Sequence, residues 1–136
     1  MDLENLDRRQ IALVASRGRC VVGLLCIFWP SLVARVWMGR SEPAVNAMTR
    51  VVGIRDLALG IGALTAIKEQ HQDAEWLSMG AVCDGFDAVV SLATPGLPKR
   101  ARLIGLFAGA MAAATMKLSR DFADERQTPP APVPAR

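Results

Sequence analysis

The sequence contains little of what metal and disulfide chemistry require. It has one histidine, His71, in a polar stretch, and three cysteines, Cys20, Cys26 and Cys83, in apolar stretches. The number of cysteines is odd, and no Cys-x-x-Cys or Cys/His spacing typical of a metal site is present. We therefore expect the cysteines to be small buried hydrophobic residues and His71 to be solvated, with no metal and no other cofactor bound.

Short motifs of catalytic and nucleotide chemistry are also missing. The sequence has no Walker-type phosphate loop, no Gly-x-Gly-x-x-Gly, no Gly-x-Ser-x-Gly and no His-Glu-x-x-His. The formal net charge is only +3, and no run of basic residues is interleaved with aromatic ones. Nucleic acid is therefore not an expected partner, and hydrolases or nucleotide-dependent enzymes of known type have no support.

Charged residues are scarce in four apolar windows that make up half of the chain. These windows hold 68 of the 136 residues and only 5 of the 29 charged ones; they are Cys20–Ala34, Met48–Ile67, Trp76–Thr94 and Leu103–Met116. A lipid environment imposes such segregation, because a membrane span needs about 20 predominantly apolar residues. A soluble bundle would need a polar face on each helix, and the fourth window has none. The pattern predicts an all-α protein, a four-span transmembrane helical bundle.

The windows also define the expected organisation of the chain. We expect an amphipathic N-terminal segment over residues 1–18, a four-helix membrane domain over 19–118, and a charged, then proline-rich disordered tail over 119–136. The first window gives only about 22 Å of helix, less than the roughly 30 Å hydrocarbon layer. Either its flanking arginines reach the membrane surface, or the helix extends back through residues 11–16 and buries an arginine. Pro30 predicts a kink near the end of this helix.

Basic residues favour one orientation in the membrane. With the N-terminus inside, nine Lys and Arg residues lie on the cytoplasmic side and six on the opposite side. The positive-inside rule then predicts that both termini are cytoplasmic. We expect a multi-pass protein of the bacterial cytoplasmic (inner) membrane, with membrane lipids as partners.

Four charged residues, Arg55, Asp56, Asp84 and Asp87, lie deep inside the second and third windows. Asp84 and Asp87 are three residues apart on one helix face, within reach of one partner. We predict that Arg55 pairs with Asp84, Asp87 or both, so that the cluster links the two helices. The alternative is a proton- or cation-linked site or a polar pocket for a small ligand, because two close carboxylates in a low dielectric resist joint ionisation.

Glycines recur at helical spacing in two of the windows. Gly53 and Gly60 share one face of the second window with Asp56, and Gly105 and Gly109 form a Gly-x-x-x-Gly in the fourth. Such glycines allow helix backbones to approach closely in lipid. We predict that all four are helix-packing positions, within the bundle or in a homo-oligomer.

The segment Gly53-x-Arg55-Asp56-x-x-x-Gly60 resembles small bacterial and fungal four-helix integral membrane proteins of uncharacterised activity. These proteins are similar in layout to DoxX-like proteins, and the similarity covers about residues 20–118. The resemblance implies a four-helix membrane fold. It implies no activity.

Two classes of function remain open from the sequence. The first is a non-enzymatic role, as a scaffold, an accessory subunit of a larger membrane complex, or a lipid- or small-ligand-binding protein organised by the Arg/Asp cluster. The second is a membrane-embedded enzyme or proton-linked carrier that uses Asp84 and Asp87 as acid/base groups. A scaffold should have every carboxylate paired and no cavity beside it, whereas an enzyme or carrier needs a pocket that reaches lipid or water.

Overall fold

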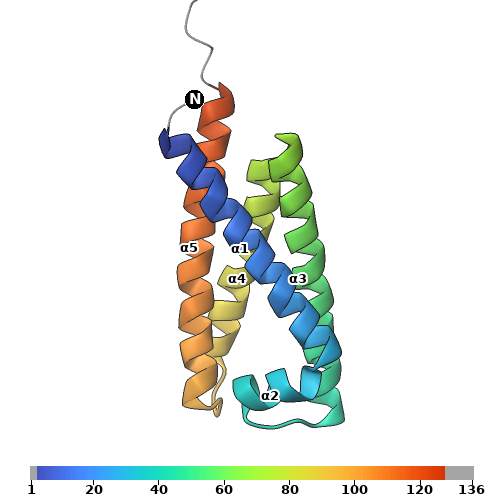
Figure 1. Cartoon of the computed structure of the whole chain (residues 1–136). Coiled ribbons are helices and arrows are strands. Elements are labelled where there is room, and N and C mark those ends of the chain that lie inside the picture. The colour runs from blue at the N-terminus through green and yellow to red at the C-terminus, as the bar shows by residue number, and fades with distance from the viewer. Residues whose placement is uncertain (1–2, 128–136) are drawn as a thin grey trace, which may run out of the picture.

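The computed structural model describes residues 3–127, which form five α-helices and no strand (Figure 1). The helices are α1 (Leu3–Phe28), α2 (Pro30–Met38), α3 (Pro43–Glu69), α4 (Asp73–Ala93) and α5 (Lys99–Gln127). The four long helices alternate in direction along the bundle. The short α2 lies across one end of it (Figure 1).

The first helix differs from the expected span over Cys20–Ala34. It runs back to Leu3 and ends at Phe28, and α2 starts separately at Pro30. The break has a local cause, because proline has no amide hydrogen and disfavours the helical conformation of the residue before it. Trp29 accordingly has non-helical angles (φ −126°, ψ 52°). The predicted kink is therefore a complete break, and the helix extends backward into the N-terminal segment.

The remaining boundaries follow from turn chemistry. α2 ends at Gly39, whose left-handed φ of 77° is accessible to a glycine without strain. The tight turn between α3 and α4 uses left-handed conformations at Gln70 and Gln72. α5 remains helical through Gln127, beyond residue 118 where the membrane domain was expected to end. The proline-rich part of the expected tail, residues 128–136, lies outside the described residues.

The long helices form two closely packed pairs, α1 with α3 and α4 with α5, with fewer contacts between the pairs. Glycine backbones make the first pair close. A methyl group at Gly53 would lie 2.7 Å from the Gly23 carbonyl oxygen, and one at Gly23 would lie 2.8 Å from that of Gly53. Gly60 is equally confined, because a methyl there would meet the Cys20 sulfur at 2.5 Å. Because these three glycines have no side chain, the backbones of α1 and α3 can approach to this short distance.

The glycines of α5 have different surroundings. A methyl group at Gly105 would lie 2.6 Å from Ser91 Cβ on α4, whereas one at Gly109 would make an ordinary 3.4 Å contact with Ala88. Gly62 of α3 was not singled out from the sequence. A methyl group there would overlap the ring of Trp76. This contact depends on a distant residue, so helical spacing alone does not reveal it.

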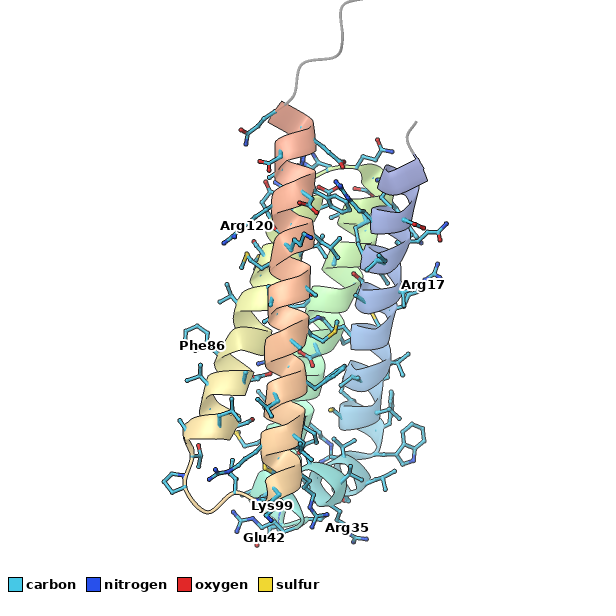
Figure 2. All side chains as sticks on the ribbon, turned by 90° about the vertical axis from the view of Figure 1, so that its left-hand side faces the viewer. Arg17, Arg35, Glu42, Phe86, Lys99 and Arg120 are labelled. Carbon is cyan, nitrogen blue, oxygen red and sulfur yellow. The ribbon has the colours of Figure 1, made fainter. Side chains whose placement is uncertain are left out.

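Small residues are buried between the helices and large apolar residues are exposed, which is the reverse of the arrangement in a soluble bundle. Eight of the thirteen buried hydrophobic residues are alanines. Large apolar side chains, such as Phe86 and Phe107, are instead exposed on the outer faces of all five helices. Figure 2 shows Phe86 directed away from the bundle. Small residues between helices and large ones outside suit a lipid environment, where close backbone approach replaces the hydrophobic effect.

Within residues 3–127, three helices are long and apolar enough to cross a membrane, namely α1 over Asp7–Phe28, α4 and α5. This property is consistent with a membrane protein. α3 is not among them, since Arg50, Arg55 and Asp56 lie in its middle part.

The close contact between α1 and α3 can be tested with alanine substitutions. Gly53→Ala should lower the free energy of unfolding by about 1–3 kcal/mol, because the new methyl group overlaps rigid backbone. Gly85→Ala is the matched control, since nothing lies within 4 Å of its added methyl group. It should be neutral or stabilising by up to about 1 kcal/mol. Thermal unfolding in detergent measures both, and equal midpoints would contradict the packing assignment.

Candidate functional site

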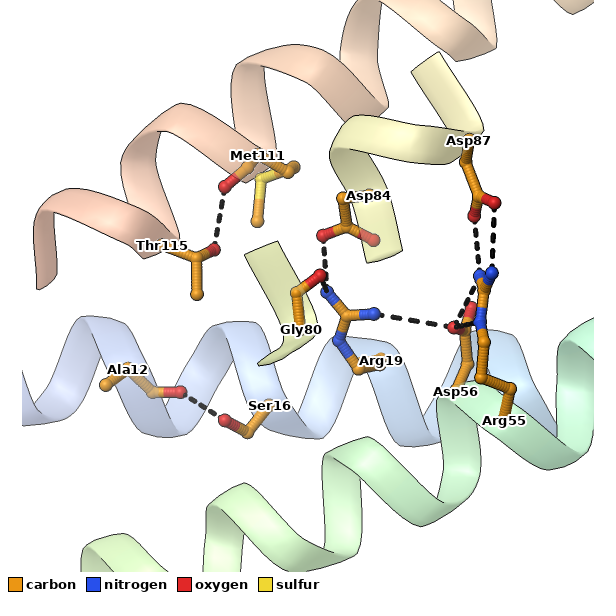
Figure 3. Close-up of polar contacts among 10 residues, drawn as sticks. All are labelled: Ala12, Ser16, Arg19, Arg55, Asp56, Gly80, Asp84, Asp87, Met111 and Thr115. Carbon is orange, nitrogen blue, oxygen red and sulfur yellow. Dashed lines mark hydrogen bonds and ion pairs between the residues drawn. The ribbon is translucent and has the colours of Figure 1, made fainter. Parts of the chain in front are cut away.

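Arg19 lies at the centre of a charged network that joins three helices (Figure 3). Its guanidinium group, on α1, donates to the Asp84 carboxylate of α4 and lies 3.4 Å from Asp56 Oδ1 of α3. It also donates to the Gly80 carbonyl oxygen at 3.4 Å. These side chains are almost completely buried. One arginine therefore connects the two helix pairs.

Arg55 forms the second part of the network, between α3 and α4. It binds Asp87 through two parallel hydrogen bonds, Nη1 to Oδ1 at 2.9 Å and Nη2 to Oδ2 at 2.5 Å. It also contacts Asp56 Oδ1 at 3.0 Å. Asp56 thus accepts from both arginines. Paired hydrogen bonds of this kind fix geometry as well as adding energy.

The sequence-predicted residues Arg55, Asp56, Asp84 and Asp87 are brought together, and the pairing of Arg55 with Asp87 is one of those predicted. Arg55 contacts Asp87, whereas Asp84 is bound by Arg19. Arg19 was not selected from the sequence as a site residue, because the first apolar window was taken to start one residue after it. Between residues 11 and 28 the charged residues are Arg17 and Arg19 alone, and this composition is the signal that places Arg19 within a candidate span rather than at its edge.

Gly80 and the spacing of the aspartates shape the α4 side of the network. Asp84 and Asp87 lie on the same face of α4, and Gly80 lies one turn before Asp84. A methyl group at Gly80 would lie 3.3 Å from the guanidinium nitrogen Nη2 of Arg19. Glycine at this position therefore leaves room for Arg19 to reach both the backbone carbonyl and the Asp84 carboxylate.

A cavity of about 620 Å³ lies beside this network, between the two helix pairs. All five helices contribute to its wall. Its charged lining residues are Arg19, Asp56, Asp84 and Asp87; most of the others are apolar, among them Val33, Leu59, Leu77, Ile104, Ala108 and Met111. The volume is within the range of ligand pockets, about 300–1,000 Å³. The site is thus an apolar chamber with one charged wall.

Partly exposed apolar side chains of α1, α2 and α5 line one side of the cavity, and we place its opening there, between α1 and α5. They are Val22, Leu25, Leu32, Val36 and Phe107, which are 42–68% exposed. Figure 1 shows why these helices do not meet here: α1 crosses the bundle diagonally and diverges from α5 toward the end that carries α2. The opening therefore has an apolar rim and faces the side of the bundle.

The opposite end of the bundle is closed by apolar packing. Ile67, Leu77 and Phe122 pack there with small residues of α1, α3 and α4. Arg9 donates to the Ile67 carbonyl oxygen at 2.5 Å, and Arg126 pairs with Asp73. The chamber therefore lies between this packed end and α2.

Comparisons with known proteins provide no relative: no protein-family model, no curated protein and no solved structure matches the chain. The function must therefore be inferred from the chamber and its charged wall.

The observed pairing can be tested by a double-mutant cycle. Arg55→Leu and Asp87→Leu should each destabilise the protein, because each leaves a buried charge without its partner. Combining them should recover about 1–3 kcal/mol relative to additivity. The crossed combination of Arg55→Leu with Asp84→Leu is the control, and its coupling should be smaller because these two side chains share no direct ion pair. Unfolding in detergent measures the three single and two double variants, and equal coupling in both cycles would refute the assignment.

Proposed function

We propose that this protein spans the bacterial cytoplasmic membrane four times and binds a lipid-like apolar molecule in its lateral chamber. The fourth span would be α3. Its outer face carries exposed apolar side chains, Met48, Val51, Ile54 and Ile61. The charges of Arg55 and Asp56 are engaged by other charged side chains rather than facing lipid alone. Paired charges remove the main objection to placing α3 in a bilayer.

The short helix α2 fits the boundary of the membrane in this arrangement. It lies across the end of the bundle (Figure 1), and Figure 2 shows Arg35, Glu42 and Lys99 gathered at the same end. An apolar face with a charged surround is typical of a helix in the interfacial plane. α2 would then form the floor of the chamber, with its lining residues Val33 and Trp37.

The observation that carries the proposal is the lateral opening with an apolar rim. A ligand in the hydrocarbon layer would enter between α1 and α5 without crossing water. The side chains that line the rim, such as Leu25 and Phe107, would contact acyl or isoprenoid chains. Enclosing apolar surface in a chamber of this size favours a molecule of lipid character over a small polar substrate.

The chamber favours a binding role over a pure scaffold. A scaffold requires that the carboxylates be paired, and each of Asp56, Asp84 and Asp87 contacts an arginine. It does not require a ligand-sized space beside them. The similarity in layout to DoxX-like proteins would agree with this membrane arrangement, and it adds no activity.

Tryptophan fluorescence can report entry of lipid chains into the chamber. Trp37 and Trp76 line it, and Trp29 is exposed, so Trp29→Phe leaves only the two chamber tryptophans. In vesicles of phosphatidylcholine brominated at mid-chain, we expect their emission to be quenched. Adding Ala15→Phe and Ala108→Phe, which fill the chamber, should reduce the quenching by at least half.

The matched control places the same two phenylalanines outside the chamber. Ala110 and Ala113 of α5 are exposed and do not line it, so Ala110→Phe with Ala113→Phe should leave the quenching unchanged. Equal quenching in both double variants would mean that bromine reaches the tryptophans from the outer surface, and the proposed function would be abandoned.

Cysteine labelling tests the proposed orientation, with both termini in the cytoplasm. Ser41→Cys, between α2 and α3, should react with a membrane-impermeant maleimide in intact bacterial cells. Gln70→Cys, in the turn between α3 and α4, should react only after the cells are opened. The reverse pattern would invert the orientation. Recovery of the protein in the soluble fraction without detergent would overturn the membrane assignment itself.

A further inference from the structure

The charges around the chamber do not balance. The network contains three carboxylates, Asp56, Asp84 and Asp87, and two guanidinium groups, Arg19 and Arg55. With all five groups ionised, its sum is −1. In a low-dielectric region an unbalanced charge is costly, so one further positive charge is favoured, either a proton on a carboxylate or a bound cation.

The excess negative charge faces the chamber. Asp56, Asp84 and Asp87 all line the cavity, together with Arg19, whereas Arg55 is not among its lining residues. Arg55 binds Asp87 and Asp56 without itself lining the cavity. A molecule in the chamber therefore meets three carboxylates and one guanidinium group.

Other charged groups of α1 and α3 do not supply the missing charge. Arg17 is exposed, and Figure 2 shows it directed away from the bundle. Arg50 is also exposed and donates to the Ile27 carbonyl oxygen at 3.3 Å. Neither residue lines the chamber. Within residues 3–127, moreover, no group of three or more His, Cys, Asp or Glu side chains is placed to hold a metal ion.

We infer that the chamber selects amphipathic organic cations: molecules with one positive charge and an apolar body. This inference rests on the proposed function, since it names the class of ligand for the same chamber. The charged group of the ligand would lie against Asp84 and Asp87, and its apolar body would lie among residues such as Leu25, Ile104 and Met111. A protonated primary amine or a quaternary ammonium group on a hydrocarbon skeleton has this chemistry. Such a molecule would enter from the bilayer through the opening between α1 and α5.

Two ions of nearly equal size and opposite charge test the inference. Tetraphenylphosphonium and tetraphenylborate are both apolar, so their comparison isolates the sign of the charge. Calorimetric titration of the full chain in dodecylmaltoside, with protein-free micelles subtracted, measures both. We expect the cation to bind at least about tenfold more tightly than the anion. Equal binding, or preference for the anion, would overturn the inference.

Isosteric variants test whether the preference for the cation comes from the carboxylates of the chamber. Asp84→Asn makes the sum of the network zero and should weaken tetraphenylphosphonium binding by at least about tenfold. Glu42→Gln, which makes the same charge change at an exposed site outside the chamber, should leave binding unchanged. If Asp84→Asn does not fold, Asp87→Asn serves in its place. Unchanged cation affinity in a folded Asn variant would overturn the inference.

The outcomes separate this inference from the proposed function. If brominated chains quench Trp37 and Trp76 but the cation shows no preference, the chamber binds apolar molecules and only the inference on charge fails. If chamber-specific quenching is absent, the proposed function fails, and the inference falls with it.

Discussion

A guanidinium group buried in an apolar helix constrains every element packed around it. An unpaired arginine at the centre of a membrane helix costs about 2.5–3.5 kcal/mol on insertion scales. Arg19 of α1 avoids much of that cost by contacting carboxylates of two other helices, Asp56 and Asp84. A shift of α1 by one residue would move this group by about 1.5 Å and weaken both contacts. One side chain therefore sets the register of three helices.

The glycine contacts hold the two helices of each pair together, whereas the charged network links one pair to the other. Gly23, Gly53 and Gly60 bring α1 and α3 so close that their backbones touch, and Gly105 lets α5 pack closely against Ser91 of α4. Contacts between the two pairs are fewer, and there the network supplies directional links. Because ion pairs hold helices at side-chain length rather than in backbone contact, space remains between the pairs. The chamber results from using these two kinds of contact in one small bundle.

Much of the helical architecture could be predicted from the sequence, because charge segregation depends only on local composition. The grouping of Arg55 with the aspartates also followed from depth and from the spacing of Asp84 and Asp87. Arg19 was not assigned to the site because a window boundary was placed at Cys20, although a first helix that extends backward and buries an arginine was one of the two alternatives. The separate α2 was missed because a proline after a long apolar run is compatible with either a kink or a break.

The chamber itself was beyond prediction from the sequence, for a physical reason. Alanine and glycine at helix interfaces permit close packing, and they equally permit an unfilled space when the helices diverge. Which of these occurs depends on the crossing of α1 over α3 and on the position of α2, both of which are properties of the whole bundle (Figure 1). Local spacing identifies small residues, but it does not give the distance between the helices that carry them.

The chamber and the network are physically coupled through the dielectric. Ion pairs such as Arg19 with Asp84 weaken when water reaches them and strengthen when an apolar group excludes it. An apolar occupant of the chamber would therefore strengthen the links between the two helix pairs. By linkage, whatever tightens the links must also favour the occupant. A ligand that also supplied the missing positive charge would act on the same groups directly, so occupancy of the chamber and cohesion of the bundle would rise together.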